Sequence, residues 1–255
     1  GKGGKWSEVS GTDDQGRWIS SHEELLALQD ENASAWYAAN SEWWAAGGYG
    51  GRTDDEAMIG DEGGHEDAEE GLVFLQGLVQ KGFRFRNGVD AGAGVGRVTK
   101  LVLLRVCEHV HLIEMDSGWV KRSKVYLGKK RAARCTFTCA RLDELPPLPE
   151  ETVDLVWVQW TLQYLTDRDV IKALIALASG LTPKGVVVVK ENRPYGCARG
   201  DRFQLETPEG DQGRYDITRT HAHHELLFGR AGLRVAVMEE GVETHTYALV
   251  KDETW

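Results

Sequence analysis

Three glycines at alternate positions, in the stretch VDAGAGVGR from Val89 to Arg97, form a loop suited to holding a ligand. The loop lies between a predicted strand and a predicted helix, where glycines let the backbone approach a ligand closely and the helix N-terminus offers N–H groups. A dinucleotide-binding fingerprint requires its third glycine three positions after the second, and Arg97 occupies that position. The spacing therefore favours a ligand other than a dinucleotide, and an NAD-dependent oxidoreductase is disfavoured.

The residues around this loop indicate the chemistry of the ligand. Asp90 followed by Gly92, Gly94 and Gly96 matches the Asp-x-Gly-x-Gly-x-Gly signature of class I S-adenosylmethionine (AdoMet) methyltransferases. An acid beside the loop suits the ammonium of such a ligand, and Arg97 suits its carboxylate through a two-donor fork. Glu114 ends the next predicted strand, where an acceptor for ribose hydroxyls is expected; the alternative is a solvated acid at a strand end.

A second chemical feature ends the apolar run VDLVWVQW, which begins at Val153. Gln159 and Trp160 place a polar and then an aromatic side chain where this strand must leave the sheet. Ligands of open α/β sheets bind outside the carboxyl ends of the strands. We therefore expect these two neighbours to serve different ligands.

The elements that must position these residues alternate between strands and helices, which predicts parallel strands joined by crossover helices. The expected fold is a doubly wound, Rossmann-like α/β sandwich with a mostly parallel seven-stranded sheet and an antiparallel C-terminal strand. Strands are predicted in RNGVDAG, HVHLIE, CTFTCA, VDLVWVQW, GVVVVKEN, LRVAVMEEG and HTYALVKD, and helices over residues 69–81, from 96, over 117–128, 167–179 and 221–230.

The first part of the chain differs from this alternating pattern. SHEELLALQD is typical of a helix that begins at a Ser cap, and a Trp- and Tyr-rich piece follows it. We expect residues 1–51 to form an N-terminal helical extension or lid, and residues 52–255 to form the methyltransferase domain.

Composition limits the classes of function. The chain has 255 residues and a formal net charge of -10, which argues against a duplex nucleic-acid partner. No run of residues is apolar enough for a membrane span, and no secretory signal begins the chain, so we expect a cytoplasmic or nuclear protein that does not bind membranes.

Metal-binding patterns are absent from the sequence. The four cysteines lack the spacing of a zinc site or a disulfide framework. His109 and His111 alternate on a strand, and His221, His223 and His224 lie together at a helix start. We expect surface or strand-end histidines and no metal.

Several motifs together resemble one family, the α-N-terminal protein methyltransferases that act on proteins beginning Xaa-Pro-Lys. These motifs are GGYG, VDAGAGVGRVTK, VWVQW, YLTD, KEN and DITRT, and the resemblance runs from about Trp36 to the C-terminus. It implies a class I methyltransferase fold, AdoMet as the cofactor, S-adenosylhomocysteine as its product, and a free protein α-amine as the methyl acceptor.

The resemblance also assigns residues to the cofactor. It implies that Gly92, Arg97 and Glu114 contact AdoMet, with Asp90 and the other loop glycines, Gly94 and Gly96, in the same site. Further cofactor contacts carried over by position are Tyr49, Met115, Leu142, Asp143 and Gln159. The family more often has Asp and Gln where this chain has Glu114 and Asp143, and both changes keep a hydrogen-bond acceptor.

On the substrate side, the resemblance implies that Trp36 and Trp160 form the pocket for the first residues of the peptide. Asn192 would hold the α-amine or its neighbouring carbonyl. A loop acid near the amine would be Asp211 or Asp216, and both remain candidates. Tyr164 stands where the family is expected to have a His, so Tyr164 or an acid must take over any role that this His plays.

The expected mechanism needs little base catalysis, because an α-amine with a pKa of about 7.7 to 8 is partly neutral at physiological pH. We expect positioning and desolvation to supply most of the rate, with Asn192, Asp211 or Asp216, and Tyr164 as the catalytic residues of a monomeric enzyme. Two alternatives are an N-methyltransferase of a small molecule or nucleic acid, suggested by ENRPY, and a non-catalytic AdoMet-binding protein.

Overall fold

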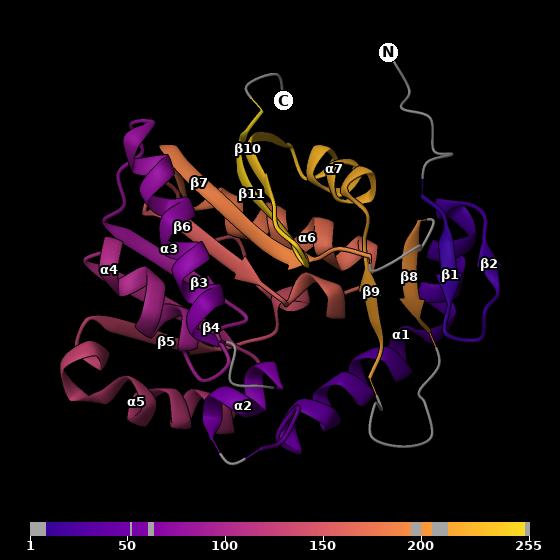
Figure 1. The fold of residues 1–255 in the computed structure, drawn as a ribbon, viewed down its shortest axis with the longest axis horizontal. Coiled ribbons are helices and arrows are strands. Elements are labelled where there is room, and N and C mark those ends of the chain that lie inside the picture. Colours follow the sequence, from indigo (N-terminus) through magenta and orange to yellow (C-terminus); the bar gives the residue numbers. More distant parts are fainter. Residues whose placement is uncertain (1–8, 52, 61–63, 195–199, 206–213, 253–255) are drawn as a thin grey trace. The chain divides into compact units, whose positions relative to one another are not determined.

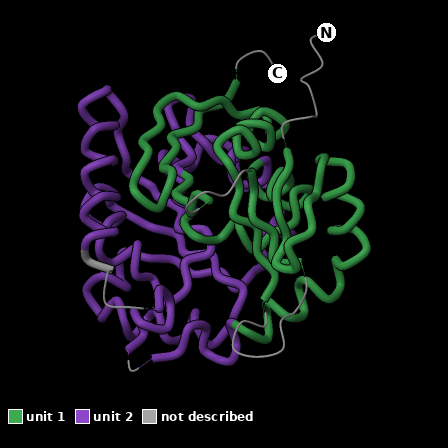
Figure 2. Tube along the Cα trace, turned by 45° about the vertical axis from the view of Figure 1, so that its right-hand side comes forward, with its two compact units in different colours: residues 1–43, 159–174, 189–255 green, residues 44–158, 175–188 purple. Residues whose placement is uncertain are grey.

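A computed structural model describes the whole chain except residues 1–8, 52, 61–63, 195–199, 206–213 and 253–255. The chain forms two compact units, each assembled from separate segments (Figure 2). Unit 1 comprises residues 1–43, 159–174 and 189–255, and unit 2 comprises residues 44–158 and 175–188. The domain boundary that the sequence placed at residue 51 stays a prediction.

The larger sheet has the strand order β10-β11-β7-β6-β3-β4-β5 (Figure 1). Its strands are β3 (Asn87–Ala91), β4 (His109–Glu114), β5 (Cys135–Cys139), β6 (Val153–Gln159), β7 (Leu181–Asn192), β10 (Leu233–Glu240) and β11 (Thr244–Lys251). β3 pairs in parallel with β4 and β6, β4 pairs in parallel with β5, and β10 pairs antiparallel with β11. The predicted seven-stranded, mostly parallel sheet with an antiparallel C-terminal strand is therefore confirmed.

The central strands consist of residues that suit burial on both faces of a sheet. Val156, Trp157 and Val158 of β6 are fully buried, as is the Val186–Val189 run of β7. The chain leaves β3 toward β4 on one side, whereas β6 pairs on the other side. This reversal places the topological switch point at the carboxyl end of β3, where the glycine loop begins.

Helices lie near the predicted residues 69–81, 117–128, 167–179 and 221–230, and a short helix at residues 54–59 was not predicted. They are α2 (Asp54–Ile59), α3 (Gly64–Gln80), α4 (Leu104–Val106), α5 (Ser117–Ala132), α6 (Asp167–Ser179) and α7 (His221–Arg230), with 3-10 turns η3 (Leu142–Glu144) and η4 (Leu162–Tyr164). Among the described residues, side-chain caps begin four of them: Thr53 for α2, Asp116 for α5, Thr166 for α6 and Thr220 for α7. The helix predicted from Gly96 differs in type, because a π-helix, η2 (Thr99–Leu103), precedes α4. No helix in the described part of the chain has the length and apolar character to cross a membrane.

The N-terminal part contains the expected helix, and also strands that the sequence did not predict. α1 (His22–Ala45) runs for 24 residues through the Trp-rich piece. β1 (Gly11–Asp13), β2 (Trp18–Ile19), β8 (Asp201–Gln204) and β9 (Asp216–Thr218) form a second sheet in the order β2-β1-β8-β9. A Cβ on Gly11 would lie 2.2 Å from the carbonyl oxygen of Asp201, so the parallel pairing of β1 with β8 requires a glycine there.

Two glycines of α3 provide a matched test of packing in unit 2. A Cβ on Gly71 would lie 3.2 Å from the ring of the fully buried Trp157, whereas a Cβ on Gly77 would meet nothing within 4 Å. We expect Gly71→Leu to destabilise the protein by about 1–3 kcal/mol through overpacking. Gly77→Leu should be neutral or stabilising, by up to about 1 kcal/mol, because glycine disfavours helix. Urea unfolding of both variants checks this, and equal midpoints would contradict it.

Candidate functional site

The glycine loop of unit 2 is bonded to the end of β4. Gly92, Gly94 and Gly96 all have left-handed backbones, with φ of 76°, 54° and 84°. The N–H groups of Gly92 and Ala93 donate to the Ile113 carbonyl at 2.9 and 3.0 Å. Left-handed backbone at these three positions favours glycine, and the predicted approach of a ligand to the loop stays a prediction.

Glu114 holds the centre of this loop. Its Oε2 accepts from the Gly94 N–H at 2.9 Å, and its Oε1 accepts from the Asp116 N–H at 2.9 Å. Burial raises the pKa of Glu114, and the bonds from Asp116 and Gly94 oppose that shift. Each carboxylate oxygen has two lone pairs, so the predicted bonds to ribose hydroxyls can be added to these two.

Asp90 is buried below the loop and fastens the helix that follows. Its Oδ2 accepts from Thr99 Oγ1 at 2.6 Å and from the Thr99 N–H at 3.1 Å. Burial raises its pKa to about 6. The structure thus gives Asp90 a role in fixing the start of η2, and its predicted contact with the ligand ammonium stays a prediction.

Arg97 forms a nearly buried ion pair with Asp67 of α3, with Nη2 at 2.8 Å from Oδ2. Nothing in the sequence singled out Asp67, which lies in an acidic stretch of ordinary appearance. A ligand carboxylate at Arg97 would share the guanidinium with Asp67. The pair holds the guanidinium in a fixed place before any ligand arrives.

The other residues assigned to the cofactor in unit 2 lie in three places. Tyr49 is 44% exposed, its N–H donates to the Ala57 carbonyl at 3.1 Å, and its ring meets Trp44 edge-on. Leu142 and Asp143 are buried in η3, where Arg141 holds the Asp143 carboxylate with two bonds of 3.1 and 2.8 Å. Met115 follows β4 and is half-buried.

The short helix α2 packs on the loop. A Cβ on Gly94 would lie 2.4 Å from Sδ of Met58, and Ala57 shares a buried cluster with Val95 and Trp119. The indole N–H of Trp119 in turn donates to the Trp44 carbonyl at 3.0 Å. The sequence missed Met58 and Trp119, although the capping box of Thr53 and Glu56 could have located α2.

These side chains fit AdoMet chemically. The ligand carries ribose hydroxyls, for which Glu114 offers carboxylate oxygens, and a carboxylate, for which Arg97 offers a guanidinium. Asp143, which the resemblance places beside the adenine, offers further acceptors, and Met58 occupies the space where a side chain on Gly94 would lie. Residues that would hold AdoMet are therefore present in unit 2, as predicted from the loop.

In unit 1, a corner forms from the residues that follow β6 and those that end β7. Trp160 has a left-handed backbone with φ of 49°, and its N–H donates to the Lys190 carbonyl at 3.0 Å. The N–H groups of Thr161 and Leu162 both donate to Glu191 Oε1 at 2.8 Å. We call Trp160, Thr161, Leu162, Glu191 and Asn192 the Trp160 corner.

The corner brings together two residues predicted on the substrate side. Trp160 and Asn192 are both half-buried, and Asn192 Nδ2 donates to Gln163 Oε1 at 3.3 Å. Gln159 directly precedes the corner, and its carbonyl accepts from Thr161 Oγ1 at 2.9 Å. Glu191 was missed, although it lies between two residues of the KEN motif.

Trp36 and Tyr164 lie in a buried part of unit 1. The Trp36 indole N–H donates to the Tyr164 carbonyl at 2.7 Å, and its ring stacks on Tyr215 at 4.9 Å. Asn40 donates to the same carbonyl at 3.2 Å. Trp36 is fully covered and belongs to a hydrophobic cluster, so this structure gives it a packing role, and its contact with a peptide stays a prediction.

The structure describes only one of the two loop acids predicted near the amine, Asp216. Asp216 begins β9 and faces Arg214, with Oδ2 at 3.5 Å from Nε. Burial raises its pKa, and the charge of Arg214 opposes the shift. Asp211 lies outside the described residues. The predicted roles of both acids stay predictions.

A buried ionic cluster in unit 1 was not predicted. Asp167 Oδ1 accepts from Arg219 Nη2 at 2.7 Å, and its Oδ2 lies 2.7 Å from His22 Nε2 and 2.9 Å from His223 Nε2. His223 Nδ1 lies 2.8 Å from Asp201 Oδ2. All five side chains are about 1% exposed or less, and the DITRT and YLTD motifs supply two of them.

The expectation of surface histidines is therefore wrong for His223 and His224, which are 0% and 2% exposed. One face of α7 is buried in unit 1, and the polar sequence HAHH does not indicate this burial. Burial lowers the pKa of His224 well below its ordinary value. His221 alone among the three keeps a partly exposed side chain.

His22, Asp167 and His223 present three atoms at the spacing of a metal site. The charges already balance, however, because Arg219 and protonated His223 face Asp167 and Asp201. A cation would add charge next to the Arg219 guanidinium in a low-dielectric interior. The cluster fits an ionic network better than a metal, and the expected absence of a metal stays a prediction.

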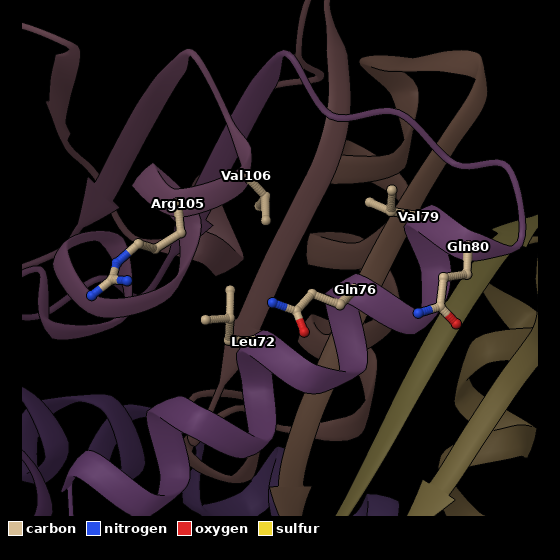
Figure 3. A pocket seen from close by; sticks show the side chains of 6 residues that line it. All are labelled: Leu72, Gln76, Val79, Gln80, Arg105 and Val106. Carbon is tan, nitrogen blue, oxygen red and sulfur yellow. The ribbon is translucent and has the colours of Figure 1, made fainter.

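Unit 2 also has a pocket. It has a volume of about 530 Å³ and is lined by Leu72, Gln76, Val79, Gln80, Arg105 and Val106 of α3 and α4 (Figure 3). None of the residues predicted for the site lines it. Its lining combines apolar and amide side chains with the Arg105 guanidinium, and it holds no carboxylate, histidine or aromatic ring.

Comparisons with known proteins agree with this geometry. Residues 32–247 match the model of a family described as AdoMet-dependent proline di-methyltransferase. The chain is similar to N-terminal Xaa-Pro-Lys N-methyltransferase 1 of Danio rerio, with 36% identity over 107 residues that cover 42% of this chain and 48% of that protein. The chain thus spans about half the length of that relative.

Two further relatives align over most of the chain. Alpha N-terminal protein methyltransferase 1 of Arabidopsis thaliana is 28% identical over 254 residues, covering 89% of this chain and 83% of that protein. A solved structure of a SAM-dependent methyltransferase from Leishmania major has a TM-score of 0.78 and 26% identity, covering 98% of this chain and 100% of that one. The Rossmann-like methyltransferase fold is therefore shown by the structure and by its neighbours.

The ionic cluster predicts how stability depends on pH. The Asp167 and Asp201 carboxylates raise the pKa of His223 to about 9, against the opposing effect of burial. Because the folded-state pKa of His223 is raised, its protonation stabilises the fold fully at pH values below the unfolded-state pKa of about 6.5. This contribution to stability is lost as the pH rises through 9. The free energy of unfolding should fall by up to about 3 kcal/mol between pH 6.5 and 9 from this group. Asp167 has its pKa lowered by His223 and Arg219, so its contribution is lost in acid.

Urea unfolding at pH 6.5 and pH 9 measures this slope. His223→Gln should flatten it, and His221→Gln on the same helix should leave it unchanged, because His221 is partly exposed. An equal slope in wild type and His223→Gln would refute the assignment.

Glu114 gives a prediction for cofactor binding. Glu114→Gln should weaken AdoMet binding about tenfold or more, since a bond from a hydroxyl to a charged acceptor contributes about 1.5–3 kcal/mol. Isothermal titration calorimetry of the purified protein measures this. The matched control is Glu108→Gln, whose exposed side chain pairs with Arg86 next to the same strand. Unchanged affinity in Glu114→Gln would contradict the ribose role.

Proposed function

The chain belongs to the family of AdoMet-dependent proline di-methyltransferases, and from this premise we propose that it methylates the free α-amino group of proteins that begin Xaa-Pro-Lys. The observation that carries the proposal is the family match over residues 32–247, which includes both the glycine loop and the Trp160 corner. The names of the relatives from Danio rerio and Arabidopsis thaliana, both N-terminal methyltransferases, support it.

The cofactor side of the proposal rests on unit 2. AdoMet, when bound, supplies a methyl group carried on a sulfonium sulfur. Glu114 would accept from its ribose, and Arg97 would hold its carboxylate. Asp67 and Thr99 support this set by fixing Arg97 and Asp90.

The substrate side rests on the Trp160 corner. The Trp160 ring would pack against the prolyl ring, because a flat apolar surface suits it. The Asn192 side chain can both donate and accept, so it would hold the α-amine or the carbonyl next to it. Positioning of this kind contributes much of the rate when the nucleophile is already in part neutral.

Charge would favour the approach of such a substrate. A peptide that begins Xaa-Pro-Lys carries two positive charges at its start, and the chain has a formal net charge of -10. This attraction acts at long range and weakens with salt. A monomeric state, a cytoplasmic or nuclear location, and the lack of membrane or duplex nucleic-acid partners stay predictions.

The assay that tests the proposal offers the purified protein AdoMet and a peptide beginning Ser-Pro-Lys, and locates methyl groups by mass spectrometry. We expect methylation of the α-amine. The same peptide acetylated at its N-terminus should gain none, because the acetylated nitrogen has no lone pair available for attack. Methyl groups on the lysine side chain, or cofactor binding without transfer to the free peptide, would overturn the proposal.

A second variant separates the peptide pocket from the cofactor site. Trp160→Leu removes the ring and keeps an apolar residue, so KM for the peptide should rise about tenfold or more, because an aromatic contact of this size contributes about 1–2 kcal/mol. AdoMet affinity should stay unchanged. Equal KM values in wild type and Trp160→Leu would argue against the assigned wall.

A further inference from the structure

Glu191 is a buried carboxylate to which neither the family match nor the motifs assign a role. It lies in β7 one residue before Asn192, and its side chain is 2% exposed. The carboxyl ends of strands in such a sheet border the ligand crevice. Glu191 therefore lies at this edge of the sheet, and both acid and amide bond to the segment 161–163: Glu191 accepts from the Thr161 and Leu162 N–H groups, and Asn192 donates to Gln163.

The two oxygens of Glu191 have different surroundings. Oε1 accepts from the Thr161 and Leu162 N–H groups at 2.8 Å each, which fixes the carboxylate in the Trp160 corner. Oε2 is buried and has no hydrogen-bond partner among the described residues. A buried carboxylate oxygen without a donor is costly, so this position favours either a proton or a donor brought by a ligand.

Burial and the groups around Glu191 together bring its pKa close to neutral. Burial raises its pKa to about 7, and the backbone N–H groups of Thr161, Leu162 and Gln163 and the charge of Arg219 act in the opposite direction. Arg219 is the charged group whose field acts on Glu191, and its Nη1 donates to the Leu162 carbonyl at 2.8 Å. Lys190 precedes Glu191 on the strand, where alternate side chains face opposite sides of the sheet.

Asp216, the described loop acid, differs from Glu191 in its partner. Its Oδ2 lies 3.5 Å from Nε of Arg214, although burial still raises its pKa against this charge. Glu191 has an unpartnered oxygen instead, and its two backbone bonds keep the carboxylate oriented in either protonation state.

We propose that Glu191 is the carboxylate that accepts the proton of the substrate ammonium at the Trp160 corner, an inference that rests on the proposed function and names its catalytic base. One N–H bond of the ammonium breaks and the proton bonds to Oε2. The electron pair left on nitrogen then forms the N–CH3 bond as the C–S bond of AdoMet breaks, and the pair of that bond stays on sulfur. Glu191 later releases its proton to solvent.

The test compares Glu191→Gln with wild type. Gln keeps the size of the side chain and an oxygen for the Thr161 and Leu162 N–H groups, and it cannot take the proton. An α-amine with a pKa of about 8 is about one-tenth neutral at pH 7, so kcat at pH 7 should fall about tenfold or more, with a much smaller change in KM. The matched control is Glu239→Gln, the same change at an exposed position of β10, which should leave kcat unchanged.

A second substrate makes the test specific for proton transfer. A peptide whose first residue bears fluorine has an α-amine of lower pKa, so it arrives already neutral. With this peptide, the kcat of Glu191→Gln should come close to the kcat of wild type. With the ordinary peptide, wild-type kcat should rise with pH through a midpoint near 7, and this limb should be lost in Glu191→Gln.

The outcomes separate this inference from the proposed function. If wild type fails to methylate the ordinary peptide, the proposed function fails and the inference fails with it. If wild type is active, and Glu191→Gln matches its kcat and pH profile, the inference alone is overturned. If circular dichroism shows that Glu191→Gln does not fold, the wild-type protein provides the test. The rise of its kcat with pH near 7 must vanish with the fluorinated peptide, and a rise that persists overturns the inference.

Discussion

Buried carboxylates that accept hydrogen bonds from backbone N–H groups organise the ends of the central strands. Glu114 at the end of β4 binds the Gly94 and Asp116 N–H groups, and Glu191 near the end of β7 binds those of Thr161 and Leu162. A carboxylate cannot be buried without such partners, and a loop N–H cannot be buried without an acceptor. Each acid therefore fixes the loop of a neighbouring strand, and the loops that would meet ligands take their shape from these bonds.

The same requirement explains why acids in one chain titrate so differently. Asp90 and Glu191 meet backbone and hydroxyl donors, so burial dominates and their pKa values rise to about 6 and about 7. Asp167 is equally buried, but it meets Arg219 and His223, and these cations hold its pKa well below the ordinary value. The chain thus separates acids that can exchange protons near neutral pH from an acid that only anchors structure.

Sequence patterns predicted the parts of the fold that repeat a simple rule. The Val-rich runs of β6 and β7 and the glycine spacing at residues 92, 94 and 96 identified the sheet and its loop before any coordinates. β1 and β8 could not be predicted, because two short segments far apart in the sequence pair only when tertiary structure brings them together. The buried state of His223 was missed for a related reason, since its two acidic partners come from α6 and β8, which lie well before it in the chain.

The position of Trp160 connects local strain to the proposed chemistry. A left-handed backbone at an aromatic residue costs about 1–3 kcal/mol. Glycine would relieve that cost, yet it would remove the ring from the corner. Three hydrogen bonds compensate at consecutive residues: the Trp160 N–H to the Lys190 carbonyl, and the next two N–H groups to Glu191. Because Glu191 supplies two of these three bonds, the acid that we propose as the proton acceptor also holds the turn that presents the Trp160 ring. One side chain therefore sets both the position of the proposed base and the turn that carries the proposed wall of the peptide pocket.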